Sequence, residues 1–388
     1  MHLFNASGFR KFSSTRCGYG LAPWYLLLNL SSWLFHLLQS NSWVVEFTAW
    51  TLKGLSCCPD LQNDHYGKDA AVLVQLEITF PDSSRDVIVT DTSWRSTTGP
   101  IRYADLYTGE EQDTRIMPGP WASVTTGEGP GNNLVASISE PVREHENFHL
   151  VRIFSTLKGD QVLDFGQNLA GWVRFTAKGS AGDTVRLAHA ETLDADSNFY
   201  TGNLRLATAE DVYVLSGAPQ ELEPHFTYHG FRYVRVEGYP GRLKRENFTA
   251  VALYSDLAAT GYFECSNSLL NQLQSNIIWS QKSNLFDIPT DCPQRSERFG
   301  WAGDAQVFCR TAAFNQDVKT FFTKWLEDLS SQQGTNGGLP IYVPDFRTPD
   351  SVGPRGGVAG WGMQQPSCPG PCLNCTVIPL SCASSIRA

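Results

Sequence analysis

The spacing of apolar residues divides the chain into a first part with a period of two and a last part with a period near 3.6. Residues 71–80 and 86–90 are two apolar runs on either side of a Pro-Asp-Ser-Ser turn, which is typical of a β-hairpin. Similar short alternating runs follow at residues 172–177, 184–188 and 233–237. These runs are separated by turns rich in Gly and Asp, so we expect a β-sandwich between about Val151 and Leu257.

Beyond about Thr260 the apolar residues recur every three or four positions, which predicts helices. We expect Ser266 to be the N-cap of the first helix, Asp304 to open the second and Asp317 to cap the third. The residues that should face inward are Leu269, Leu270, Leu273, Ile277 and Ile278 on the first helix, and Phe321, Phe322, Trp325, Leu326 and Leu329 on the third. The pattern therefore predicts a multidomain β + α chain.

The richest group of candidate catalytic side chains lies between residues 291 and 304. It contains the acids Asp291, Glu297 and Asp304, two arginines and Trp301. Cleavage of a glycosidic bond needs one carboxylic acid to protonate the departing oxygen, and further acids can hydrogen-bond the ring hydroxyls of the sugar. A surface loop of solvated ion pairs would use the same residue types, so composition alone leaves both interpretations open.

The wording of this segment, Asp-Cys-Pro-Gln-Arg-Ser-Glu-Arg-Phe-Gly-Trp-Ala-Gly-Asp, resembles the signature of the bacterial-type α-L-rhamnosidases, glycoside hydrolase family 78. The resemblance includes residues 164–174, 189–191 and 226–235 in the order that the family has them, and it covers roughly residues 66–362. The resemblance implies β-sandwich domains followed by the first helices of an (α/α)6 barrel. The loop that enters the second helix would then carry the chemistry.

The resemblance also implies roles for individual residues. Glu297 matches the general acid of an inverting α-L-rhamnosidase, and Asp291, Arg295, Trp301 and Asp304 match the positions that contact rhamnose. Ser296, between these positions, departs from the acidic residue common there. The implied partners are rhamnose-containing glycosides or polysaccharides, from which terminal α-L-rhamnose would be removed. The alternative is a non-catalytic remnant that binds carbohydrate.

The resemblance suggests five parts, bounded at 1–65, 66–150, 151–258, 259–362 and 363–388. The first is unassigned, the second and third are β-sandwich domains, the fourth starts the barrel, and the fifth is a tail rich in Cys and Pro. Helical periodicity ends after Gly362, so most of the barrel, with the family's general base, is expected to be missing. We therefore expect an inactive chain in which the inward residues of the third helix are uncovered.

The overall charge of −9 argues against nucleic acid as a partner, because no excess of Lys or Arg is available to neutralise phosphates. Aromatic residues make up 12% of the chain, which suits either stacking on sugars or core packing. The apolar stretch at residues 24–38 is interrupted by polar residues and is too short for a spanning helix. It has no clean cleavage site, so the compartment stays open between cytoplasmic and secreted.

No metal or cofactor is expected at the site. The clustered cysteines at residues 368–382 lack the paired spacing and the histidines of a zinc site. In some relatives the N-terminal domain binds rhamnose with calcium, and Glu110 and Asp113 lie in the matching region, although both also suit a solvated loop. Two further residues, His189 and Glu191, lie near a predicted strand end, where a structural or a catalytic role would fit.

Overall fold

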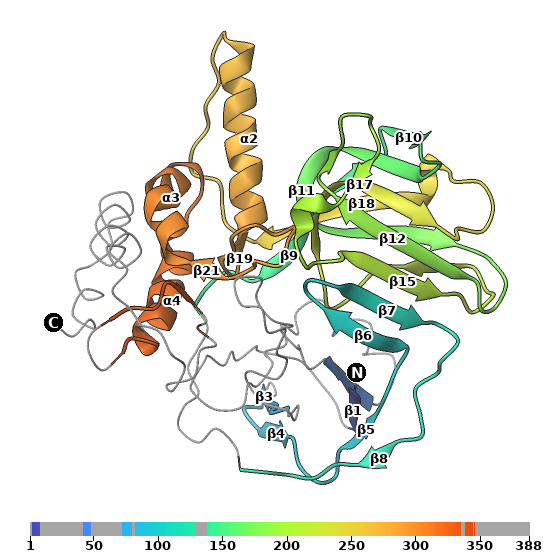
Figure 1. Cartoon of the computed structure of the whole chain (residues 1–388). Helices are drawn as coiled ribbons and strands as arrows, with labels where there is room; N and C mark the ends of the chain where they lie inside the picture. The colour runs from blue at the N-terminus through green and yellow to red at the C-terminus, as the bar shows by residue number, and fades with distance from the viewer. Residues whose placement is uncertain are drawn as a thin grey trace.

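The computed structural model of the chain describes residues 2–7, 42–47, 72–79, 82–128, 138–334, 338–343 and 345. A ten-stranded sheet forms the centre of this structure, and three α-helices follow it in the chain (Figure 1). The fold class expected from the sequence, β domains followed by the first helices of a barrel, is confirmed. The strands of the sheet are β6 (Ile101–Asp105), β7 (Gly109–Asp113), β9 (Val142–His149), β10 (Arg152–Ser155), β11 (Gln161–Ala177), β12 (Thr184–Ala190), β15 (Glu210–Val214), β16 (Gln220–Leu222), β17 (His229–Glu237) and β18 (Phe248–Ser255).

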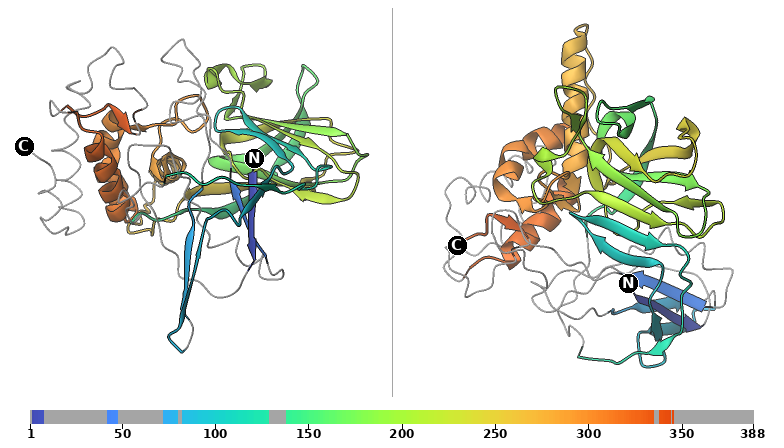
Figure 2. Two further views of the ribbon diagram at one scale, coloured as in Figure 1. Left: turned by 90° about the horizontal axis from the view of Figure 1, so that it is seen from below. Right: turned by 45° about the vertical axis from the view of Figure 1, so that its right-hand side comes forward.

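The long strand β11 shapes the sheet. The strand order is β6-β7-β15-β12-β17-β11-β18-β9, and β10 and β16 also pair with β11. The register of β11 against β17 shifts between Asp164 and Leu169, so the two halves of β11 can bend into different parts of the sheet. The sheet is curled (Figure 2). Its core contains fully buried aromatic rings, among them Phe175, Phe231 and Phe248. Burial of each such ring contributes about 1.5–3 kcal/mol, so this core holds the β region together.

The smaller β elements lie around this sheet. The predicted hairpin is confirmed by the antiparallel pairing of β3 (Gln75–Thr79) with β4 (Arg85–Val89). The other elements are β1 (His2–Ser7), β2 (Ser42–Phe47), β5 (Arg95–Thr97), β8 (Ala122–Ser123), β13 (Thr192–Leu193), β14 (Phe199–Tyr200), β19 (Leu285–Phe286), β20 (Ile288–Pro289), β21 (Gly300–Trp301), β22 (Tyr342–Val343) and the 3-10 helices η1 (Gly202–Leu204) and η2 (Arg245–Asn247). None of the helices among the described residues has the length and apolar character to cross a membrane. The apolar stretch at residues 24–38 and the cysteine-rich tail lie outside the described residues.

The three helices are α2 (Ser268–Asn284), α3 (Ala302–Asn315) and α4 (Lys319–Ser331). The first begins one residue later than expected, because the side chain of Asn267, and not that of Ser266, accepts the hydrogen bond from the Leu269 amide at 3.0 Å. Helix α3 begins at Ala302, two residues before Asp304. The N-cap of α4 is Val318, so the prediction that Asp317 caps this helix is wrong by one residue, although the Asp317 carboxylate accepts a hydrogen bond from the Lys319 amide at 3.2 Å.

The sequence predicted exposed apolar residues on α4, but the structure has them on α2 and α3. Phe321, Phe322, Trp325 and Leu329 of α4 are all buried, because they pack against neighbours that include Leu257 and residues of α3. The prediction that they are uncovered is therefore wrong. The exposed apolar residues lie on α2 and α3 instead, namely Leu269, Leu270, Leu273, Val307 and Phe314.

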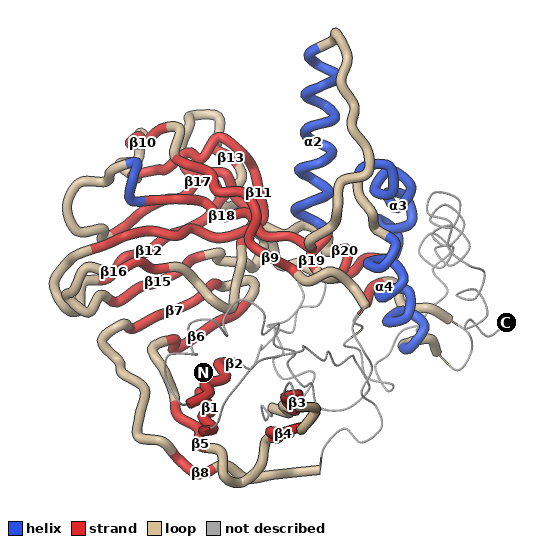
Figure 3. Tube along the Cα trace, turned by 180° about the vertical axis from the view of Figure 1, so that it is seen from behind, coloured by secondary structure: helices blue, strands red, loops and turns tan. Residues whose placement is uncertain are grey.

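Helix α2 joins the two regions at its C-terminal end. Its far end projects from the rest of the structure, while its base lies against the sheet (Figure 3). At this base, Lys282 donates to the Glu146 carboxylate of β9 at 2.5 Å, and Trp279 packs edge-on against Phe148 at 5.2 Å. The Tyr254 hydroxyl also donates to Glu146, at 2.7 Å. The helices are therefore held against the β region beside the loop that carries the candidate site.

Candidate active site

The loop between β20 and α3 is closed by its own backbone. The amide of Asp291 donates to the Phe299 carbonyl at 3.1 Å, and Thr290 and Gly300 form an isolated β-bridge. The acid-rich segment thus leaves and re-enters the structure at adjacent points, which fixes the loop at its neck. This position, on the loop that leads into α3, is the one expected from the sequence.

Glu297 is held by arginines from both regions of the molecule. Its Oε2 atom lies 2.8 Å from Nη2 of Arg295, on the same loop, and 2.5 Å from Nη1 of Arg205, which follows η1 in the β region. Hydrogen bonds between charged partners are shorter and stronger than neutral ones, so both contacts fix the carboxylate. Arg205 lies 92 residues from Glu297 in the chain, and sequence inspection did not identify it.

Ser296 fastens the loop to the β region. Its amide donates to the Leu204 carbonyl at 3.4 Å, and its hydroxyl oxygen accepts from the Leu206 amide at 3.3 Å. The side chain is buried, so these contacts satisfy polar groups that water does not reach. Ser296, which stands where the family commonly has an acidic residue, therefore has a structural role. It connects residues 204–206 to the acid loop by hydrogen bonds.

The other acids lie close to Glu297. Burial raises the pKa of Asp291, and the nearby carboxylates of Asp304 and Glu297 act in the same direction, while the Cys292 thiol and Arg295 oppose it. The Cys292 thiol donates to Asp291 Oδ1 at 3.2 Å. Asp304 is exposed in the first turn of α3. The structure therefore brings together the three acids that the sequence proposed.

The same segment supplies buried donors that point to a polar ligand. Nε of Arg295 and Nε1 of Trp301 are both buried and have no hydrogen-bond partner among the described residues. The Trp301 ring packs edge-on against Tyr342 at 5.1 Å, which holds the indole in place. A buried donor without a partner is costly, so a bound molecule rich in hydroxyl groups would satisfy these atoms.

Glu191 is a further carboxylate beside the loop. It accepts hydrogen bonds from Asn168 at 2.9 Å and Asn203 at 3.4 Å, and it faces Arg295. Burial raises the pKa of its carboxyl group. The sequence left its role open between structural and catalytic, and the structure places it at the edge of the candidate site. The only signal in the sequence was its place within the family-like run at residues 189–191.

Arg298 anchors the loop from its other side. Its Nη1 donates to the Tyr228 carbonyl at 2.6 Å, and its guanidinium group lies 4.7 Å from the centre of the Tyr228 ring. The side chain is buried in the β region, whereas the preceding residue, Glu297, turns toward Arg205 and Arg295. Sequence inspection grouped Arg298 with the acid loop without recognising that it is an anchor.

Comparisons with known proteins find three family models that match successive parts of residues 41–372. The profile described as the bacterial α-L-rhamnosidase 6 hairpin glycosidase domain matches residues 258–372. Profiles of the family's concanavalin-like domain and of its N-terminal domain match residues 155–254 and 41–146. The chain belongs to the bacterial α-L-rhamnosidase family, glycoside hydrolase family 78. The matches begin before Tyr66 and end after Gly362, so they extend beyond the stretch recognised from the sequence.

Individual relatives show the same family. An α-L-rhamnosidase of Streptomyces avermitilis is 41% identical over 310 residues, which are 76% of this chain and 30% of that protein. One from Formosa agariphila is 37% identical over 325 residues, 79% of this chain and 33% of that protein. The structure of an α-L-rhamnosidase from Aspergillus terreus matches with a TM-score of 0.84 and 32% identity, over 99% of this chain and 49% of that one. The S. avermitilis enzyme in complex with L-rhamnose gives a TM-score of 0.80 and 31% identity, over 99% of this chain and 40% of that one. This family member thus spans about a third of the length of the curated relatives it matches.

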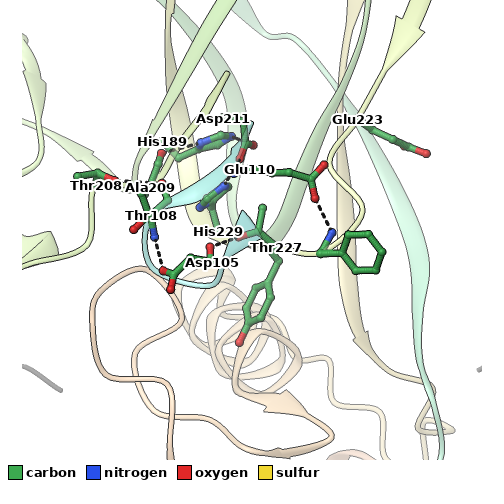
Figure 4. Close-up of polar contacts among 12 residues, drawn as sticks. Asp105, Thr108, Glu110, His189, Thr208, Ala209, Asp211, Glu223, Thr227 and His229 are labelled. Carbon is green, nitrogen blue, oxygen red and sulfur yellow. Dashed lines mark hydrogen bonds and ion pairs between the residues drawn. The ribbon is translucent and has the colours of Figure 1, made fainter. Parts of the chain in front are cut away.

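The N-terminal residues proposed for calcium in this rhamnosidase family member do not fit a calcium site. Glu110 is buried on β7 (Figure 4). Its carboxylate accepts hydrogen bonds from the amides of His225 and Phe226 and from the side chain of Gln112. Asp113 on the same strand pairs with Arg115 at 2.8 Å. The solvated-loop interpretation is also wrong for Glu110, because β7 pairs with β15 and covers the residue. Both acids already have partners, so no calcium is assigned to them.

A second group of potential metal ligands is buried in the β region. His189, Asp211 and His229 are fully buried, and Nε2 of His229 lies 3.0 Å from Oδ1 of Asp211 (Figure 4). His189 donates through Nδ1 to the Ala209 carbonyl at 2.9 Å. The two imidazole rings stack at 4.1 Å with only 20° between their planes, so their lone pairs do not converge on one ion. These contacts favour a structural role for His189.

The loop itself also offers three potential metal ligands, which are Asp291, Cys292 and Glu297. Burial, together with the adjacent Asp291, raises the pKa of the Cys292 thiol to about 12. A thiol must lose its proton to bind a metal ion, so this cysteine is a poor ligand at neutral pH. The chemistry of the loop is therefore better explained by its carboxylates and arginines.

Proposed function

We propose that residues 291–304 form the acid side of an inverting α-L-rhamnosidase site. Glu297 is the general acid, and Asp291, Arg295, Trp301 and Asp304 hold the rhamnose. The observation that carries this proposal is the convergence of three carboxylates with two buried donors, Arg295 Nε and Trp301 Nε1, that lack partners among the described residues. A sugar presents hydroxyl groups that both donate and accept, which such a mixed lining requires.

In this mechanism Glu297, which contacts Arg205 and Arg295, is the proton donor. Glu297 delivers a proton to the glycosidic oxygen as its bond to the sugar breaks, while water attacks from the opposite face. The base that activates this water belongs about 6.5–9.5 Å from the acid, and the family resemblance places it in a part of the barrel beyond Gly362. A general acid must hold its proton when the bond to the sugar breaks.

The proposal predicts different activities for the 388-residue chain and for a form extended through the barrel. The 388-residue chain should bind rhamnose but should not turn over, because it is expected to lack the base. A form extended through the rest of the catalytic barrel should hydrolyse terminal α-L-rhamnosides. The non-catalytic alternative, a carbohydrate-binding remnant, predicts binding without turnover in both forms.

Calorimetric titration of the chain with L-rhamnose, with D-glucose as the control sugar, tests the first activity. Release of p-nitrophenol from p-nitrophenyl α-L-rhamnoside by the extended form tests the second. Rhamnose binding that Asp291→Ala weakens, together with p-nitrophenol release, would support the proposal. Binding without release in the extended form would favour the remnant, and absence of rhamnose binding by either form would contradict the proposed site.

A further inference from the structure

The acid loop rests on the start of strand β17. We call the two residues that receive it, Tyr228 and Gly230, the β17 platform. The Tyr228 carbonyl accepts the hydrogen bond from Arg298 Nη1 at 2.6 Å. Gly230 lies against the loop backbone, since a Cβ added to it would come 2.8 Å from the amide nitrogen of Gln294 and 3.0 Å from its Cα. The platform therefore meets the loop three residues before Glu297 and one residue after it.

Gly230 is required for space and not for backbone conformation. Its φ angle lies outside the left-handed region, and ordinary Cβ contacts lie at 3.4–4 Å. A glycine inside a strand often marks the place where another segment of backbone approaches closely. Any side chain at this position would push Gln294 away from β17 by a few tenths of an ångström, so the glycine sets how closely the loop packs on the β region.

Arg298 fixes the other end of this contact. Its side chain is buried, and its guanidinium carbon lies 4.7 Å from the centre of the Tyr228 ring and 5.7 Å from that of the Tyr107 ring. Its Nε and Nη2 atoms have no hydrogen-bond partner among the described residues. A buried cation with so few polar partners depends strongly on the hydrogen bond and the ring contacts that it does make. The backbone at residue 298 is therefore held to β17.

The residue between these contacts is the proposed general acid. Ser296, which is hydrogen-bonded to Leu204 and Leu206, holds the chain on one side of Glu297, and Arg298 holds it on the other. A general acid must lie within hydrogen-bond reach of the oxygen that it protonates, about 2.6–3.2 Å. Catalytic groups misplaced by about 1 Å can lose on the order of 10²-fold in rate, so contacts that fix this backbone affect the acid step.

We infer that the β17 platform positions the carboxyl group of Glu297 for proton transfer, with Gly230 and Arg298 as positioning residues. The inference rests on the proposed function and goes beyond it, because it assigns part of the acid step to the β region. Both residues act through the backbone of the loop and not by contact with the sugar. A change in either should therefore harm reactions that depend on proton donation more than reactions that do not.

The experiment measures kcat/KM of the form extended through the barrel on methyl and on p-nitrophenyl α-L-rhamnoside. Methanol is a poor leaving group that needs the proton, whereas p-nitrophenolate leaves with less help, so the methyl to p-nitrophenyl ratio reports the acid step. Gly230→Ala should lower this ratio by about three- to tenfold, because the loop must move away from β17. Arg298→Lys keeps the charge but loses the planar group beside the Tyr228 ring, and it should lower the ratio by about tenfold.

Gly127→Ala is the matched control, since a Cβ added to Gly127 meets nothing within 4 Å. Its ratio should equal that of the wild type. Thermal melts establish which variants fold, and if Arg298→Lys does not, Gly230→Ala decides. A wild-type ratio in Gly230→Ala, or in a folded Arg298→Lys, would overturn the inference while cleavage by the wild type upholds the proposed function. If the wild type cleaves neither rhamnoside, the proposed function fails and the inference fails with it.

Discussion

The β region and the helical region differ in how completely they cover their own apolar residues. In the ten-stranded sheet, large side chains such as Leu163, Phe175 and Phe231 are fully buried within one continuous core. In the helices, the inner face of α4 is buried but the outer face of α2 is not, and Leu269 is 78% exposed. Apolar residues gathered on one exposed face mark a surface that associates with something else.

The proposed active site lies where these unequal regions meet. The acid loop belongs to the less covered helical region, yet Arg205, Ser296 and Arg298 connect it to the β region. The sheet thereby positions the acid loop, which belongs to the helical region. Of that region, the described residues include three helices. Pre-organised contacts of this kind fix catalytic groups far better than a loop could alone.

The largest expected effect is on chemistry in the helical region. In a form extended through the barrel, Glu297→Gln should reduce the rate on alkyl or flavonoid rhamnosides by about 10²–10⁴, because no proton reaches the leaving oxygen. Activated aryl leaving groups need less help and should suffer less. Comparison of kcat/KM on the two substrate classes, with Glu221→Gln on the exposed edge of β16 as the control, measures this. Near wild-type turnover on both classes would exclude Glu297 as the acid.

The next effect is on the free energy of unfolding when one leucine of each region is replaced by alanine. Leu163→Ala in the β core should lower the free energy of unfolding by about 2–5 kcal/mol, because it leaves a cavity among buried neighbours. Leu269→Ala on α2 removes a side chain that solvent already reaches, so it should change stability by no more than about 0.5 kcal/mol. Urea unfolding of both variants tests the contrast. An equal loss in the two would mean that α2 is covered in solution.

Much of this contrast could be predicted from sequence, because local periodicity reports local structure. The hairpin at residues 71–90 and the three helices were predicted from spacing alone, and the confirmed fold class followed from family-like runs. Periodicity identified the apolar face of α4 but could not show that Leu257 and α3 cover it. The N-cap also moved by one residue, since Ser266 and Asn267 both suit that position.

The connections between the regions could not be predicted, because they join residues far apart in the chain. Glu110 looked like a loop residue, yet it accepts hydrogen bonds from amides 115 and 116 residues away. Arg205 and Glu297 are separated by 92 residues, and no spacing rule relates them. The sequence could therefore identify the acid loop but not the groups of the β region that hold it.

A smaller effect concerns sugar binding at the junction. Asp291→Ala and Asp304→Ala should each weaken L-rhamnose binding by roughly 1.5–3 kcal/mol, the range for loss of a hydrogen bond to a charged group. Thermal stability should stay close to that of the wild type. Asp256→Ala, an exposed carboxylate paired with Arg143 in the β region, is the control for general charge effects. Equal loss of stability in both loop variants with unaltered affinity would make the loop a structural ion-pair network.

The smallest effect is a pH dependence confined to the β region. Burial raises the pKa of Glu110 from 4.5 to about 7, so the stability it contributes is present below about pH 4.5 and is lost as pH rises through 7. Burial lowers the pKa of His189 from 6.5 to about 3, which removes stability as pH falls through that range. Between pH 5 and 6.5 these two groups act in opposite directions, so the contribution of Glu110 is measured by urea unfolding as the difference in stability between the wild type and Glu110→Gln. This difference should shrink toward pH 8, at no more than about 1.4 kcal/mol per unit.

Glu110→Gln has no carboxyl group to titrate, so its stability should rise toward pH 8 relative to that of the wild type. Its absolute stability should be lower, because an amide places a donor opposite the amides of His225 and Phe226. Glu221→Gln, exposed on β16, controls for the loss of one carboxylate. Identical slopes in the wild type and Glu110→Gln would show that Glu110 is not the titrating group.

Hydrogen–deuterium exchange with and without methyl α-L-rhamnoside tests most directly whether the two regions build one sugar site. The amide of Ser296 donates to Leu204, and the amide of Leu206 donates to Ser296, so a ligand that steadies the acid loop should slow exchange on both sides of the junction. We expect protection in peptides covering residues 291–304 and 201–206, with none in β9 or β10. Protection confined to one side, or absent from residues 291–304, would contradict a sugar site shared by the two regions.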